Sequence, residues 1–198
     1  MERELAGDLR LLPEPLTRWT IEGPGGFIGT GRIINDASFA VSSPETITFN
    51  PQIIFDNRDD FSVEVGGPAE FVSGSLVQFQ ESGGTGRLTG GTWFIEDGGR
   101  LTLGSARLAS SSASLFFRGS GVITNLVGDF ESEHSFDLSG SAQFVLDGTF
   151  TNNGLLDVEF GSALIASSIE NEGGATINGE LTGSVGFFSD WKGSGKVN

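Results

Sequence analysis

Short segments in which apolar and polar residues alternate run through most of the chain. Clear examples are Leu101-Thr102-Leu103, Leu156-Asp157-Val158 and Ala175-Thr176-Ile177, and turns rich in Gly, Asn and Ser separate them. Successive side chains of a strand point to opposite faces, so each segment predicts a strand with one buried face and one solvated face. Helical spacing of apolar residues is absent after residue 20. The pattern predicts an all-β protein.

The alternating segments recur at a roughly constant interval. Sliding the chain along itself until Gly91 meets Gly148 places Gly91-Thr92-Trp93 on Gly148-Thr149-Phe150, and Gly104-Ser105-Ala106 on Gly161-Ser162-Ala163. Apolar positions then coincide with apolar positions and turns with turns. We call this the Gly91–Gly148 alignment, and its length is consistent with three repeats of about 19 residues each.

A single repeat is also visible. Residues 150–154 (FTNNG) align with residues 169–173 (IENEG), and the turn Gly140-Ser141-Ala142 returns one repeat later as Gly161-Ser162-Ala163. The repeat length therefore drifts between about 19 and 21 residues, which would give roughly eight or nine coils. Gly and Asn tolerate the left-handed backbone of tight corners, so three short strands and three such corners per repeat predict one coil of a parallel β-helix.

Asparagines at corners form part of this prediction. Asn125, Asn152 and Asn171 each follow an apolar Ile or Phe by two residues and are expected to stack as a ladder along one corner. A β-sandwich with Gly-rich turns is the alternative fold. Greek-key sandwiches do not normally repeat their sequence at a fixed period, which favours the solenoid.

The run of residues 147–167 (DGTFTNNGLLDVEFGSALIAS) resembles the degenerate G-x-F-x-N-x-G-x-L repeats of bacterial secreted β-solenoids. These include autotransporter passengers and filamentous-haemagglutinin-type adhesins, and the resemblance extends over residues 66–186. It implies a single-stranded, right-handed parallel β-helix and an extracellular or cell-surface location in bacteria. The start of the chain lacks the apolar core of a secretory signal. The protein is therefore expected to be either cytosolic or a mature or trimmed form of a secreted chain, and the repeat favours the second.

Three regions are expected along the chain. Residues 1–19 form an N-terminal cap or leader, in which Leu5, Leu9 and Leu12 occupy one side of a short helix ended by Pro13, or else a flexible segment. Residues 20–65 form irregular first coils or a lead-in β segment. Residues 66–198 form the regular rungs of the β-helix.

Charge and composition limit the classes of partner. The formal net charge is −15, and no long apolar stretch is present. A negative surface repels phosphate backbones and anionic lipid, so neither nucleic acid nor membrane insertion is expected. The chain has no Cys, which excludes disulfides and thiolate chemistry.

Candidate catalytic and metal-binding residues are few. The single histidine, His134, lies in an acidic loop and is expected to be solvated. The densest carboxylate run, residues 56–60 (DNRDD) with Glu64 beyond, is the candidate for calcium, although consecutive acids on a hairpin usually point apart into water. We assign no catalytic, cofactor-binding or metal-binding residue from the sequence.

Other motifs favour structural roles. The glycines of residues 23–29 and 83–86 precede strands and not helices, so turns explain them better than phosphate loops. Trp19, Trp93 and Trp191 could stack on sugar rings, yet Trp93 aligns with Phe150 and is expected in the core.

The sequence predicts a non-enzymatic extracellular structural or adhesive module, with end-to-end self-assembly as one way of acting. Its expected partners are another copy or another β-solenoid subunit at the exposed coil ends, and a surface glycan or protein. The alternative is a β-helix protein that binds or cleaves carbohydrate along a lateral groove.

Overall fold

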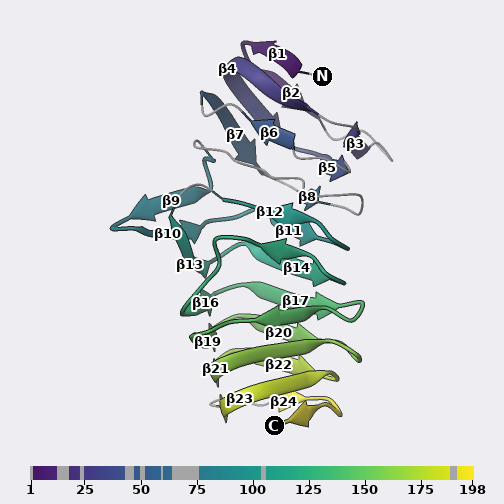
Figure 1. Ribbon diagram of the computed structural model, residues 1–198, viewed down its shortest axis with the longest axis vertical. Helices are drawn as coiled ribbons and strands as arrows, with labels where there is room; N and C mark the ends of the chain where they lie inside the picture. The colour runs from purple at the N-terminus through teal and green to yellow at the C-terminus, as the bar shows by residue number, and fades with distance from the viewer. Residues whose placement is uncertain are drawn as a thin grey trace.

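The computed structural model describes residues 2–12, 18–22, 25–42, 47–49, 52–58, 60–63, 76–103, 106–187 and 191–198. These residues form a β-solenoid of about 7 turns, with the two ends of the chain at opposite ends of the stack (Figure 1). The fold class predicted from the repeat is confirmed, with fewer coils than expected. The described residues contain no helix, hence none that could cross a membrane.

Two nine-stranded sheets form the two long sides of the solenoid. Sheet II contains β9 (Phe79–Ser82), β10 (Thr85–Leu88), β13 (Arg107–Ser111), β16 (Phe130–Ser132), β18 (Gln143–Val145), β19 (Thr149–Asn152), β21 (Ala163–Asn171), β23 (Glu180–Phe187) and β25 (Lys196–Val197). Sheet III contains β3 (Arg18–Glu22), β5 (Ser38–Ser42), β8 (Asp60–Val63), β11 (Thr92–Ile95), β14 (Ser114–Arg118), β17 (Ser135–Ser139), β20 (Leu155–Val158), β22 (Gly174–Ile177) and β24 (Trp191–Lys192). Among the described strands, only β9 and β10 pair antiparallel.

Two smaller sheets complete the coils. Sheet I, at the N-terminal end, contains β1 (Glu2–Ala6), β2 (Leu9–Leu11), β4 (Gly25–Asn35), β6 (Ile47–Phe49) and β7 (Ile53–Asn57). Sheet IV contains β12 (Arg100–Leu101) and β15 (Val122–Ile123).

The register of sheet III defines the length of each coil. One column of paired positions in this sheet runs through Trp93, Leu115, Phe136, Leu156 and Ala175. The interval between successive members shortens by one residue at each step along the chain. The coil before it, from Phe61 to Trp93, is longer because it includes the β9–β10 hairpin. The drift in repeat length is confirmed, with a slightly wider range than the sequence predicts.

The Gly91–Gly148 alignment is wrong as a structural equivalence. It superposes Trp93 of β11 in sheet III on Phe150 of β19 in sheet II, and these strands belong to different sides of the coil. Both strands alternate buried and outward residues, so their sequences are similar although they belong to different sheets. The single-repeat alignment of Phe150 with Ile169 is confirmed by the pairing of β19 with β21.

A continuous apolar core fills the solenoid, and aromatic rings dominate its middle coils. The ring of Phe136 lies 5.3 Å from that of Phe117 and 4.9 Å from those of Phe144 and Phe150. Trp93 is fully buried, as predicted. Each coil buries its inner face against its neighbours, which is how a stack of short repeats gains stability.

A polar ladder runs inside one corner. The Nδ2 of Asn152 donates to the Oδ1 of Asn171 at 2.6 Å, and Asn35 donates to Asn57 at 2.8 Å. Ser132 occupies the same register position one coil before Asn152. The predicted ladder is confirmed for Asn152 and Asn171. Asn125 is not part of it, because its amide binds the carbonyls of Leu103 and Ala106.

The N-terminal segment differs from its prediction. Residues 2–12 form strands β1 and β2, which pair in parallel with β4, and not a capping helix. Leu9 and Leu12 are exposed, whereas Leu11 is 3% exposed, so burial follows the strand pairing and not the helical spacing. Gly25, Gly26 and Gly29 lie within β4 and are not turn residues, whereas Gly83 and Gly84 form the turn of the β9–β10 hairpin.

Candidate functional site

One column of side chains on the outer face of sheet III combines aromatic and charged residues. Strand register places Phe94, Phe116, Asp137, Asp157, Thr176 and Lys192 on successive coils. The neighbours of each residue along its strand point into the core up to β22, so alternation directs this column outward. The column is therefore a stripe of functional groups parallel to the axis of the solenoid.

The two phenylalanines form a stacked pair. Their ring centroids are 4.9 Å apart and their planes are inclined by 21°. Both side chains are half-buried and present part of their rings to solvent. Outward aromatic residues on adjacent coils make a flat apolar platform beside the carboxylates.

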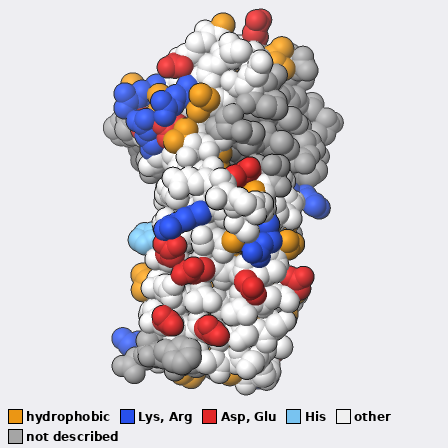
Figure 2. Space-filling model, turned by 90° about the vertical axis from the view of Figure 1, so that its left-hand side faces the viewer, with side chains coloured by type: hydrophobic (Ala, Val, Ile, Leu, Met, Phe, Trp, Pro, Cys, Tyr) orange, Lys and Arg blue, Asp and Glu red, His pale blue; other side chains and the backbone are white. Residues whose placement is uncertain are grey.

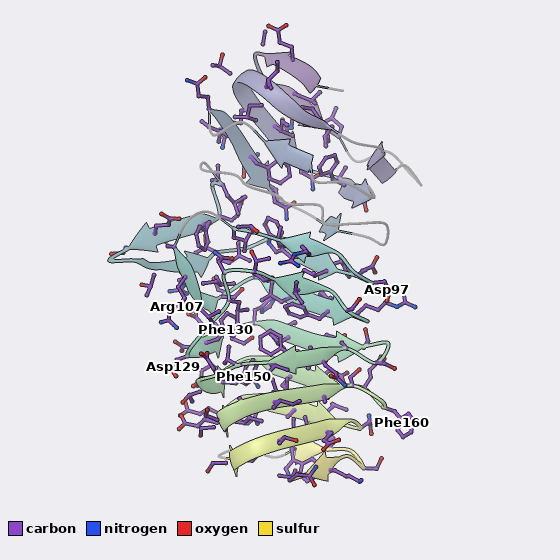
Figure 3. All side chains as sticks on the ribbon, in the orientation of Figure 1. Asp97, Arg107, Asp129, Phe130, Phe150 and Phe160 are labelled. Atoms are coloured by element: carbon purple, nitrogen blue, oxygen red, sulfur yellow. The ribbon has the colours of Figure 1, made fainter. Side chains whose placement is uncertain are left out.

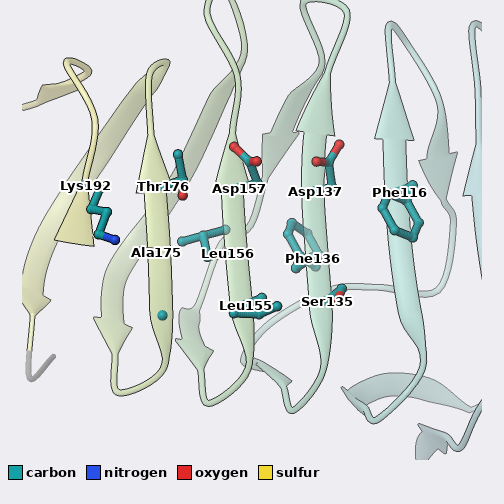
Figure 4. A pocket seen from close by; sticks show the side chains of 11 residues that line it. Phe116, Ser135, Phe136, Asp137, Leu155, Leu156, Asp157, Ala175, Thr176 and Lys192 are labelled. Atoms are coloured by element: carbon teal, nitrogen blue, oxygen red, sulfur yellow. The ribbon is translucent and has the colours of Figure 1, made fainter. Parts of the chain in front are cut away.

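The coils that carry Asp137 and Asp157 line a shallow groove of about 510 Å³ (Figure 4). Phe116 lies at one end of the groove and Lys192 at the other. Leu155, of which 64% is exposed, forms part of the side of the groove. The groove thus has an apolar wall, two carboxylates at its centre and a cation at its C-terminal end.

Burial changes the ionisation of both carboxylates. It raises the pKa of Asp137 to about 6, with further increases from the charges of Asp157 and Glu159 and an opposing hydrogen bond from Ser139. Burial followed by the charge of Glu159 also raises the pKa of Asp157. Like charges on neighbouring coils disfavour simultaneous ionisation. The surroundings therefore do little to stabilise the negative charges of Asp137 and Asp157.

Asp157 also has an unsatisfied acceptor. Its Oδ1 is buried, and none of the described residues donates a hydrogen bond to it. A buried polar atom without a partner costs free energy, and a donor supplied from outside would recover it. The groove is consequently suited to a ligand that carries hydrogen-bond donors.

A second hollow of about 420 Å³ adjoins the groove and shares Phe116 with it. Phe94, Glu96, Arg118 and Glu159 also line this hollow. The two hollows together extend from β11 to β24, so an elongated ligand has more contact surface here than a single small molecule requires.

The residues singled out from the sequence lie elsewhere. His134 is exposed in the bend between β16 and β17, as predicted. Asp56 is 3% exposed, and its carboxylate binds Arg32, Arg58 and Gln78. The expectation that this carboxylate points into water is therefore wrong, because Arg32 and Gln78 on adjacent coils and Arg58 on its own coil stabilise it inside the sheet.

Some residues of the predicted calcium site lie outside the part of the chain that the structure describes. Asp59 and Glu64 are not among the described residues, and Asp60 belongs to β8. Within the described ranges, no three His, Asp or Glu residues converge as metal ligands. Asp56 is engaged in ion pairs and contributes no free ligand.

The tryptophans do not form the aromatic platform. Trp93 is in the core, and Trp191 is 39% exposed on β24 at the C-terminal end. Trp19 lies on β3, and its side chain is outside the described set. The platform consists of Phe94 and Phe116, which the sequence analysis did not select.

Two sequence signals could have revealed the groove. Trp93-Phe94-Ile95 and Leu115-Phe116-Phe117 are runs of three apolar residues, and a strand must turn the middle one outward when both neighbours are buried. Asp157 follows Asp137 by the length of one repeat. The wrong Gly91–Gly148 alignment concealed both relationships.

Comparison of the chain with protein-family models, curated proteins and solved structures finds no match. The fold and the geometry of the groove therefore carry the functional argument.

Proposed function

We propose that this chain is a non-enzymatic extracellular structural or adhesive rod that binds a surface glycan through the groove of sheet III. The observation that carries this proposal is the continuous column of Phe94, Phe116, Asp137 and Asp157 along the groove and the hollow that adjoins it. Aromatic faces bind the apolar faces of sugar rings, and carboxylates accept hydrogen bonds from their hydroxyl groups. The resemblance to bacterial secreted β-solenoids supports the extracellular setting.

The proposal of binding rests on the aromatic platform and not on the ionisation of the carboxylates. Hydrolysis by a carboxylate pair needs one protonated acid and one ionised partner, so the surroundings must move the two pKa values apart. Burial shifts the pKa values of Asp137 and Asp157 in the same direction. Since like charges on neighbouring coils disfavour simultaneous ionisation, the pair also meets one requirement of the cleaving alternative, which the assay below tests by the appearance of new reducing ends.

Binding of soluble neutral polysaccharides, measured by isothermal titration calorimetry, tests the proposal. The wild-type chain is expected to bind, and Phe116→Ala is expected to weaken binding roughly fivefold to tenfold, since an aromatic contact contributes about 1 kcal/mol. Phe160→Ala is the matched control, because Phe160 is 89% exposed and lies outside the groove. Binding that Phe116→Ala leaves unchanged would refute the site, and new reducing ends would support the cleaving alternative.

End-to-end self-association is a second candidate role. Trp191 on β24 and Val197 on β25 are 39% and 45% exposed, and these strands are the last described ones in sheets III and II. Exposed apolar residues on strands with an open edge favour addition of another chain. Lys192 and Lys196 on the same short strands oppose it, because lysine on an edge strand disfavours pairing.

Negative-stain microscopy across concentration tests this second role. Filaments that lengthen with concentration and are shortened by Trp191→Lys would support it. Particles with the length of one solenoid at every concentration would rule it out.

A further inference from the structure

Charge is distributed very unevenly along the solenoid. Residues 119–187 contain no Lys or Arg. The same segment carries the acidic residues Asp129, Glu131, Glu133, Asp137, Asp147, Asp157, Glu159, Glu170, Glu172 and Glu180. It supplies the coils from β16 to β23. These coils are therefore strongly negative, and the next cations along the chain are Lys192 and Lys196 in the last coil.

Arginines gather at the other end. Arg10 of β2 pairs with Asp36 at 2.5 Å, and Arg32 of β4 and Arg58 after β7 each pair with Asp56 at 2.7 Å. We call these three arginines the arginine cluster. Their side chains are 58%, 36% and 45% exposed, whereas that of Asp56 is 4% exposed. The guanidinium groups thus cover the carboxylates and form the solvent-facing layer.

The arginine cluster and many of the acidic side chains share one side of the rod. Figure 2 shows a compact group of basic side chains near the N-terminal end of this side and separate acidic side chains over its C-terminal half. Between them, Arg87 and Glu133 form an ion pair, which reduces the charge of the middle. This side therefore has a positive end and a negative end.

We propose that two copies of the chain associate side by side in opposite directions, with the arginine cluster of each copy against the acidic half of the other. A two-fold axis perpendicular to the rod produces both contacts at once, and such a self-complementary arrangement closes at two subunits. Parallel association would place like charges together. Complementary charge sets the orientation of partners and raises the rate of association.

An exposed apolar side chain adds contact surface beside the arginine cluster. Ile54 of β7 is 42% exposed and lies in register with Arg32. Interfaces combine such apolar contacts with a charged rim.

Sedimentation velocity with two charge-altered variants tests the proposal. The first variant, Arg10→Glu with Arg58→Gln, weakens the arginine cluster and leaves Arg32 and Gln78 bound to Asp56. The second variant, Glu170→Arg with Glu172→Arg, makes part of the acidic half basic. The wild-type chain is expected to dimerise near 0.15 M salt, where a screening length of about 8 Å keeps contacts between facing charges and damps the repulsion between two chains of net charge −15. It is expected to dissociate near 1 M salt, where the screening length is only about 3 Å.

Each variant alone is expected to dimerise at least about tenfold more weakly than the wild-type chain. An equimolar mixture is expected to recover dimers, because the acidic cluster of the first variant then faces the basic surface of the second. The matched control, Asp97→Arg with Glu159→Arg, makes the same change in charge on the opposite side of the rod, where Asp97 and Phe160 lie (Figure 3). The control should dimerise like the wild-type chain.

Two results would overturn the proposal. One is a wild-type chain that stays monomeric near 0.15 M salt up to high concentration. The other is a mixture that fails to recover dimers although circular dichroism shows both variants folded. If the first variant lowers stability, Arg10→Glu alone replaces it, because Arg10 has no described bond to Asp56.

Discussion

Replacement of Asn152 by alanine tests the polar ladder inside the solenoid. Asn152 is fully buried, and its Nδ2 donates to the Oδ1 of Asn171 at 2.6 Å and to the carbonyl of Gly174 at 3.2 Å. Its Oδ1 accepts from the amide of Gly154 at 3.3 Å. Alanine leaves these groups without this partner in a site closed to water. A buried polar group without its partner costs about 1–3 kcal/mol, so we expect a loss of about 2–4 kcal/mol in the free energy of unfolding.

Equilibrium urea denaturation followed by circular dichroism measures this loss. Asn153→Ala is the matched control, since Asn153 is the next residue, is exposed and binds Glu131 at the surface. The control should change the free energy of unfolding by less than about 0.5 kcal/mol. A loss below about 1 kcal/mol for Asn152→Ala, equal to that of the control, would refute the ladder as a source of stability.

Three further substitutions test the core, the groove and the coil spacing. Phe136→Ala should lower the free energy of unfolding by about 3–5 kcal/mol, whereas Phe160→Ala, at an exposed position, should change it little in the same denaturation assay. Folding raises the pKa of Asp137 from 3.8 to about 6, so its carboxylate opposes folding increasingly as pH rises through this window. Asp137→Asn should therefore stabilise the chain at pH 7 by about 1 kcal/mol, after allowance for solvent screening, and have little effect at pH 3, and thermal unfolding at both values checks this. Gly154→Ala should lower the melting temperature by several degrees, because its Cβ would overlap the backbone carbonyl of His134 in the preceding coil, whereas Gly174→Ala would meet only a side chain at 3.1 Å.

Local pattern was sufficient to predict the class of fold. Alternation in segments such as Leu156-Asp157-Val158 identifies which side chains enter the core, and the interval between Asn152 and Asn171 identifies one coil. The burial of alternate side chains and the coil length both depend on contacts between adjacent repeats, and such contacts produce a visible period in the sequence. The prediction that Trp93 lies in the core is confirmed, although it rested on the alignment with Phe150, which is wrong as a structural equivalence. Both residues occupy inward positions of their strands, so the prediction survives the wrong pairing.

Register between distant coils could not be obtained in this way. The two long sheets share one alternating pattern, so the sequence does not distinguish a strand of sheet III from one of sheet II. Coil length also shortens gradually from the coil after Trp93 to the coil after Leu156. Shifting the sequence along itself by a fixed number of residues therefore aligns non-equivalent positions over several coils. Such an alignment does not reveal the column that joins Phe116 to Asp137 and Asp157.

The N-terminal segment illustrates a different limit. The spacing of Leu5, Leu9 and Leu12 suits a helix, but the edge of β4 offers backbone partners to an extended chain. Pairing with that edge satisfies the backbone groups of β1 and β2 that face β4, and Leu11 becomes buried. Tertiary contacts thus override a weak helical pattern.

Hydrogen–deuterium exchange of the chain with and without a bound neutral polysaccharide tests the central claim most directly. The claim is that the outer face of sheet III is the binding surface. Peptides covering β14, β17 and β20 should exchange more slowly when the polysaccharide is bound, while those covering β13, β16 and β19 of sheet II should be unchanged. Protection confined to sheet II or to the terminal strands β24 and β25, with none at β14, β17 and β20, would contradict it.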